Sequence, residues 1–263
     1  MQTLKMERKD YPAVGEAVYQ TTLRNGLKVF LLPKRDFNET YGIMTANFGS
    51  IDTSFIPRGS NQAVQYPAGV AHFLEHKLFE DENGQDLLQQ FVELGAESNA
   101  FTSFTKTSYL FSATDNVLEN VRLLQSLLEN AYFTEESVQR EQGIIQQEID
   151  MYKDNPDYYL FFHTLANLYP DTPLAEDIAG SVESIAEITV EDLDENFETF
   201  YHPSNMSLLL IGNFDLEKTI AVIQEQHESL KGIDEASLIR RFPLALNPVI
   251  STGSVRMEVA SSK

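Results

Sequence analysis

The segment GVAHFLEHKLF at residues 69–79 decides the fold. Within it, two histidines and a glutamate are surrounded by apolar residues. His72 and His76 are four residues apart, so on a helix they lie on one face, about 40° apart. Both imidazoles can then reach one cation, and zinc favours nitrogen ligands. Glu75 lies on the same side, placed to act on a water molecule without binding the metal. The segment therefore predicts a helix over 70–79 with a zinc-hydrolase site, in the reverse order of His-Glu-x-x-His. The alternative is a chance pattern on a solvated helix, which the apolar neighbours disfavour.

A zinc hydrolase needs a third protein ligand, and the chain has no cysteine to supply one. The absence of cysteine also excludes disulfide scaffolds and thiol catalysis. Three further histidines are present: His202 in a Tyr-His-Pro turn, His227 on a polar helix face and His163 in an aromatic run. A structural interpretation is favoured for each of them. The third ligand is therefore sought among the carboxylates.

A helix predicted over 134–154 offers two such carboxylates. Thr134 can cap it, and a stripe at steps of three and four residues should face the protein interior. The stripe consists of Val138, Glu141, Ile145, Glu148 and Tyr152. Burying two glutamates is costly unless a partner compensates, and a cation opposite the stripe removes that cost. The alternative is a helix register misplaced by one residue, which would leave both glutamates in solvent.

The remaining pattern predicts an α+β fold with a mostly antiparallel sheet. A hairpin is expected around Asn25-Gly26, because this dipeptide separates two β-rich runs within 18–32. Further strands are predicted over 41–48, 98–103, 107–114 and 206–211, and further helices over 86–94, 116–130, 158–168, 190–200 and 216–230. One domain is expected over 1–241, a Pro- and Gly-bearing linker over 242–253, and the first strand of a second domain within 254–263.

Composition narrows the possible partners. The 263 residues carry a formal net charge of −21, which repels nucleic acid and draws in cationic peptides, although such a charge also simply maintains solubility. The N-terminus has no apolar signal-peptide region, and no run of about 18 apolar residues could cross a membrane. The expected location is therefore the cytoplasm, with no nucleic-acid or membrane partner.

Residues 25–230 resemble the pitrilysin/insulinase family of inverted-zincin metallopeptidases, which includes the mitochondrial and bacterial processing peptidases. The similarity is carried by 69–76, by GAESNAFT at 95–102 and by FYHPSNM at 200–206. It is greatest for the small members from Gram-positive bacteria. The resemblance implies a zinc ion held by His72, His76 and Glu148, with Glu75 as catalytic base and Glu141 supporting catalysis from outside the ligand set. It also implies that Asn99, Ala100 and Phe101 hold the substrate as an added strand.

The resemblance further implies a zinc metalloendopeptidase domain that hydrolyses small or unfolded peptides. Family chains carry two homologous halves, and here the second is represented only by the strand expected at 254–259. A second half or a partner subunit, as a homodimer or a heterodimer, is therefore expected, and activity of this chain alone stays open. The main alternative is a peptide-binding subunit of a heteromeric processing protease. A lyase of the S-ribosylhomocysteine-cleaving type is disfavoured, because its metal needs a cysteine ligand and the chain has no cysteine. A purely structural zinc site is also disfavoured, because such sites usually have four protein ligands and only three are evident here.

Overall fold

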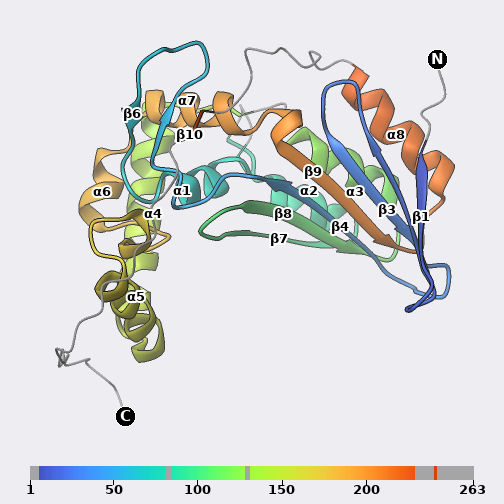
Figure 1. Ribbon diagram of the computed structural model, residues 1–263, viewed down its shortest axis with the longest axis horizontal. Helices are drawn as coiled ribbons and strands as arrows, with labels where there is room; N and C mark the ends of the chain where they lie inside the picture. Colours follow the sequence, from blue (N-terminus) through green and yellow to red (C-terminus); the bar gives the residue numbers. More distant parts are fainter. Residues whose placement is uncertain (1–5, 81–83, 128–130, 229–239, 242–263) are drawn as a thin grey trace.

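A seven-stranded sheet forms the centre of the computed structural model, which describes residues 6–80, 84–127, 131–228 and 240–241 (Figure 1). The strand order is β1-β2-β3-β9-β4-β8-β7. All neighbours are antiparallel except β3 and β9, which are parallel. The predicted α+β fold with a mostly antiparallel sheet is therefore confirmed. The strands are β1 (Glu7–Tyr11), β2 (Glu16–Thr22), β3 (Lys28–Pro33), β4 (Thr40–Ala46), β7 (Ala96–Thr102), β8 (Thr107–Ala113) and β9 (Met206–Gly212).

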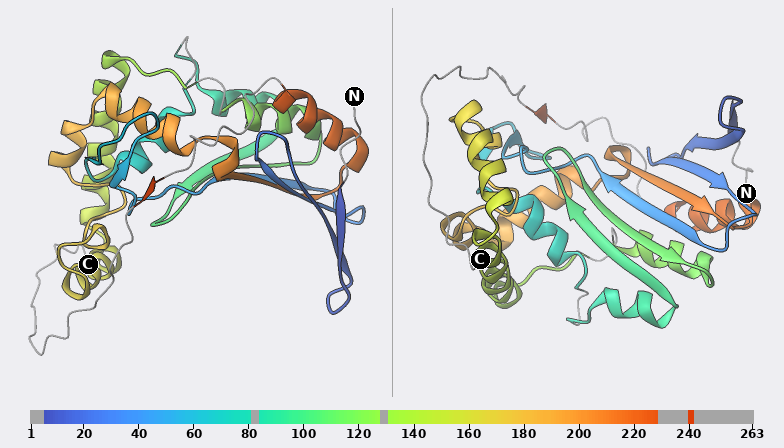
Figure 2. Two further views of the ribbon diagram at one scale, coloured as in Figure 1. Left: turned by 45° about the horizontal axis from the view of Figure 1, so that its top comes forward. Right: turned by 90° about the horizontal axis from the view of Figure 1, so that it is seen from below.

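Helices cover one face of this sheet and extend past one of its ends. Helices α2 (Leu87–Glu93), α3 (Val117–Ser126) and α8 (Leu216–Glu228) lie over one face (Figure 2). The others gather at the end where β7 and β8 turn, beside a small sheet of order β10-β5-β6 (Figure 1). These elements are α1 (Val70–Lys77), α4 (Glu135–Lys153), α5 (Pro156–Leu168), α6 (Val182–Glu187), α7 (Val190–Phe200), two short 3₁₀ turns (Pro173–Ala175 and Pro203–Asn205), β5 (Ser54–Ile56), β6 (Val64–Gln65) and β10 (Arg240–Arg241).

Alternating burial explains why the helices occupy one face only. In β4 every second residue is buried, and Met44 and Ala46 belong to the core with Leu208 and Leu210 of β9. Of the residues between them, Thr45 is partly buried and Leu209 is exposed, as expected for an antiparallel sheet with one packed face. The predicted turn at Asn25-Gly26 is also confirmed: Asn25 Oδ1 accepts from the Leu27 amide, and Gly26 has φ of 93°.

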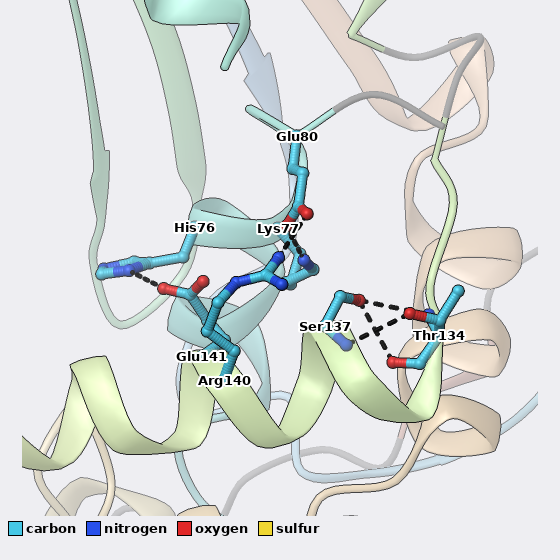
Figure 3. Close-up of polar contacts among 7 residues, drawn as sticks. All are labelled: His76, Lys77, Glu80, Thr134, Ser137, Arg140 and Glu141. Atoms are coloured by element: carbon cyan, nitrogen blue, oxygen red, sulfur yellow. Dashed lines mark hydrogen bonds and ion pairs between the residues drawn. The ribbon is translucent and has the colours of Figure 1, made fainter. Parts of the chain in front are cut away.

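Helix α4 has the start and the inward stripe predicted for it. Thr134 and Ser137 form a reciprocal capping box at its first turn (Figure 3). Glu141 is buried together with Val138 and Ile145, and Glu148 is partly buried. The alternative register, with both glutamates in solvent, is therefore wrong.

Several short elements were not predicted. No strand was predicted where β5 and β6 lie, and β1 and α6 were not anticipated either. These elements are brief, and β1 is exposed along its whole length, so they carry little periodic hydrophobic signal. The predicted linker and second-domain strand at 242–263 lie outside the described residues. Within the described residues, no helix is long and apolar enough to cross a membrane.

Candidate metal centre

Helix α1 presents both histidines of the predicted site, and a glycine sets where it begins. Gly69 precedes the helix with φ of 93°, a region that disfavours side chains. A Cβ at this position would lie 2.6 Å from the carbonyl oxygen of Ala179. Because the chain can pass this close only at a glycine, α1 enters the core at a fixed point. The rings of His72 and His76 then lie 4.6 Å apart, centroid to centroid.

Helix α4 brings the third carboxylate to these rings. The Oε2 atom of Glu148 lies 3.4 Å from Nε2 of His76 and 3.8 Å from Nε2 of His72. In a tetrahedral site with zinc–ligand bonds of about 2.0–2.1 Å, ligand atoms lie about 3.4 Å apart. Two imidazoles and one carboxylate also form a donor set that catalytic zinc uses, with one position left for water or substrate. The three residues therefore fit a zinc ion, and within the described residues they form one group with metal-binding geometry.

Glu141 contacts the other nitrogen of His76. Its Oε1 atom lies 2.9 Å from Nδ1 (Figure 3). A carboxylate at Nδ1 favours the tautomer that leaves the Nε2 lone pair free for a metal, and it fixes the ring orientation. Glu141 is therefore placed to orient a ligand rather than to act as one.

The two histidines differ in their electrostatic surroundings. Burial and the neighbouring His76 lower the pKa of His72 to about 4, so that its imidazole is neutral near pH 7. Burial would also lower the pKa of His76, but hydrogen bonds to Glu141 and Glu148 outweigh burial and raise it to about 9. Metal binding requires a neutral imidazole, so a metal that binds near pH 7 displaces a proton from His76.

Glu75, which precedes His76 on α1, is held by a residue that the sequence analysis did not identify. Burial raises the pKa of its carboxyl group, against the opposing effect of a hydrogen bond from Thr102. The Thr102 hydroxyl donates this bond to Oε2 of Glu75 over 2.5 Å. Thr102 ends the predicted edge segment, but no spacing rule connects it with a residue 27 positions earlier. The contact depends on where β7 lies relative to α1.

A cavity of about 530 Å³ joins this site to the free edge of the sheet. Its lining includes Glu75, His76 and Glu141, together with Asn99 and Ala100 of β7. Among the strands that the structure describes, the order ends at β7, which confirms the expected edge strand. The Ala100 amide donates to the Asn99 side chain at 2.8 Å rather than to β8, so this amide faces the unpaired edge. A larger hollow, of about 1160 Å³ between α2, α3 and α8, contains none of these residues.

Not every predicted site residue lines this cavity: His72 and Glu148 are outside its lining, so the metal group meets the cavity at His76. Phe101 is 40% exposed and is absent from the lining. Alternation along β7 directs its side chain to the opposite face from Ala100. His163 packs against the ring of Tyr159, and His202 accepts a hydrogen bond from the Ser204 amide, so neither joins the metal group. The side chain of His227 lies outside the described part of the chain.

Two models of one protein family match the sequence. "Insulinase (Peptidase family M16)" matches residues 54–182, which contain the three candidate zinc ligands, and "Peptidase M16 inactive domain" matches residues 187–259.

Relatives of the chain carry zinc-protease names. The chain is 48% identical over 231 residues to an uncharacterised zinc protease, YmfH of Bacillus subtilis, covering 88% of this chain and 54% of that protein. It is 28% identical over 209 residues to an Arabidopsis thaliana protein named as a mitochondrial-processing peptidase subunit beta, covering 78% of this chain and 38% of that one.

A solved structure described as an M16-like peptidase, from Alicyclobacillus acidocaldarius, superposes with a TM-score of 0.80 at 37% identity, covering 91% of this chain and 54% of the other. The chain thus spans 38–54% of the length of these relatives and of this solved structure.

Proposed function

The chain belongs to the insulinase family of peptidases, family M16, and from this membership we propose that it is the zinc-bearing part of a metalloendopeptidase acting on small or unfolded peptides. The observation that carries the proposal is the convergence of four side chains. His72, His76 and Glu148 share one metal-binding point, and Glu75 lines, together with His76, the cavity beside the edge strand β7.

Glu75 and Thr102 have separate tasks in the proposed reaction. A bound zinc ion would polarise the scissile carbonyl group and lower the pKa of a water molecule. Glu75 accepts a proton from the attacking water and later delivers it to the leaving amine. Its raised pKa suits both tasks, because such a carboxyl group holds a transferred proton more readily than an exposed one. Thr102 keeps the carboxylate directed into the cavity through its hydrogen bond.

The edge strand β7 suggests how the peptide is held. A substrate segment that adds beside β7 would exchange backbone hydrogen bonds with its outward groups, including the Ala100 amide. In the structure, that amide donates a hydrogen bond to Oδ1 of Asn99. The Asn99 side chain would therefore have to turn away before the amide could bind the substrate. Strand addition requires an extended peptide, so short or unfolded substrates are favoured over folded proteins.

Replacing Glu75 with glutamine tests the assigned chemistry. Glu75→Gln should retain zinc, because Glu75 is not one of the three ligands, while cleavage of a quenched fluorescent peptide falls about 10²–10⁴-fold. Glu198→Gln serves as the matched control, since Glu198 is exposed on α7 and outside the cavity. Zinc content is measured by atomic absorption on the same samples. A Glu75→Gln variant that cleaves at the parent rate would refute the role of Glu75.

A second function is favoured by the face of the sheet that no described helix covers. Opposite the helical layer, Tyr41 and Ile43 of β4 are only partly buried, and Leu209 of β9 is 37% exposed. The matched relatives are also about twice as long as this chain. Both observations support a peptide-binding part that acts with a second homologous half or a partner subunit. The native mass of the assembly, measured beside peptide cleavage with and without added zinc, separates this alternative from activity of the chain alone.

A further inference from the structure

A buried lysine follows the second histidine of the metal centre, and the proposed chemistry does not use it. The side chain of Lys77 is 0% exposed. A buried ammonium group is costly unless an opposite charge and hydrogen bonds compensate. Here the ammonium group of Lys77 pairs with Oε2 of Glu80, three residues further along the chain.

The same carboxylate also receives a cation from helix α4. The other oxygen of Glu80, Oε1, accepts a hydrogen bond from the guanidinium group of Arg140 (Figure 3). Burial would raise the pKa of Glu80, but the hydrogen bonds from Lys77 and Arg140 outweigh burial and lower it. The carboxylate therefore stays charged and bridges two cations that belong to two different helices.

This bridge runs beside the contact that orients the zinc ligand. His76 and Lys77 are neighbours on α1, and Glu141 and Arg140 are neighbours on α4. Two links therefore join the same pair of turns: His76 to Glu141 directly, and Lys77 to Arg140 through Glu80 (Figure 3). A single link would allow one helix to pivot about the contact, whereas two adjacent links resist rotation.

We infer that Glu80 is a positioning residue, which by bridging Lys77 and Arg140 fixes α1 against α4 and so holds His76 at the correct distance from Glu148. The inference rests on the zinc ligands assigned above. The position of α1 relative to α4 matters because ligand atoms from the two helices must stay about 3.4 Å apart in a tetrahedral site. A small rotation of α1 would change the separations of both histidines from Glu148.

A simpler role for Glu80 would be only to neutralise Lys77. Substituting Arg140 distinguishes this role from that of a bridge between the two helices. Removing Arg140 leaves the Lys77–Glu80 pair intact and takes away only the link to α4. Arg140 is 50% exposed, so the protein should fold without it. Arg122 of α3 is the matched control: it is 47% exposed, pairs with Glu225 and lies outside the metal cavity.

The experiment measures metal binding without substrate, which keeps it independent of peptide cleavage. The metal-free chain and its Arg140→Met, Arg140→Lys, Glu80→Gln and Arg122→Met variants are titrated with Co²⁺, whose visible absorption reports coordination geometry. We expect Arg140→Met to weaken Co²⁺ binding about three- to tenfold, below the 10–100-fold typical for a direct partner of a ligand. Its spectrum should change, and Glu80→Gln should weaken binding at least as much.

Arg140→Lys should restore most of the affinity, because a lysine can still pair with Glu80, and Arg122→Met should bind as the parent chain does. Thermal unfolding of the metal-free proteins should be similar for Arg140→Met and Arg122→Met, since each substitution removes the ion pair of a half-exposed arginine. Parent-like Co²⁺ affinity and spectrum in Arg140→Met would overturn the inference. So would an Arg140→Lys variant as weak as Arg140→Met. If the parent chain bound no Co²⁺, the ligand assignment would fail and the inference with it.

Discussion

His76 lies between two carboxylates of the same helix, and the nitrogen that each one faces separates their roles. Glu141 contacts Nδ1, while Glu148 faces Nε2, and the same oxygen of Glu148 also lies near Nε2 of His72. Burial alone would suggest the opposite assignment, because Glu141 is the more buried of the two. A ligand to zinc must share a point with both imidazoles, and Glu148 does so.

Substituting each glutamate with glutamine should therefore give different losses of zinc affinity. Glu148→Gln removes the anionic ligand and leaves two histidines, so we expect a loss well above 100-fold. Glu141→Gln keeps all three ligands and removes only the partner of His76, for which about 10–100-fold is typical. The zinc dissociation constants are measured by competition with a chromophoric chelator. If Glu141→Gln lost more affinity than Glu148→Gln, the two roles would have to be exchanged.

Helices α1 and α4 are the elements that the sequence predicts best, because each is specified by several independent signals. Spacing places the histidines on one face of α1, and Thr134 with the inward stripe defines α4. The choice of Glu148 over Glu141 needed the family resemblance as well. The contacts from Thr102 to Glu75 and from Arg140 to Glu80 could not be predicted. They join residues 27 and 60 positions apart, and they depend on packing angles and strand register that no local pattern encodes.

Strand β7 permits a test at the level of one backbone group. The Ala100 amide faces the free edge, so Ala100→Pro removes a donor to the substrate without removing a hydrogen bond to β8. A lost backbone hydrogen bond is worth about 0.5–1.5 kcal/mol, so KM should rise about two- to tenfold.

Zinc content and the circular dichroism spectrum of Ala100→Pro should match those of the parent, because the strand retains its ladder with β8. An unchanged KM in a correctly folded variant would show that the substrate does not pair with β7 at this position.

The negative electrostatic field is a property of the whole molecule. The formal charge of −21 is spread over 263 residues, and the metal cavity follows the same bias. Among the described residues its lining includes four acidic side chains, Glu75, Glu80, Asp86 and Glu141. Against them stand Arg140, which is already paired with Glu80, and His76, which is neutral when it binds a metal. The acidic side chains of the lining add to the negative field of the whole molecule in attracting cationic peptides, and a bound zinc ion would offset part of their charge.

The salt dependence of peptide binding should therefore vary with peptide charge. With the zinc-loaded Glu75→Gln variant, which needs no turnover, affinity is measured by fluorescence anisotropy for a lysine- and arginine-rich peptide and a neutral peptide of equal length. Raising the ionic strength from about 0.01 M to about 0.15 M shortens the Debye length from about 30 Å to about 8 Å. We expect the cationic peptide to bind on the order of tenfold more weakly, while the neutral peptide changes little. Equal salt responses would mean that the negative charge maintains solubility and does not select the substrate.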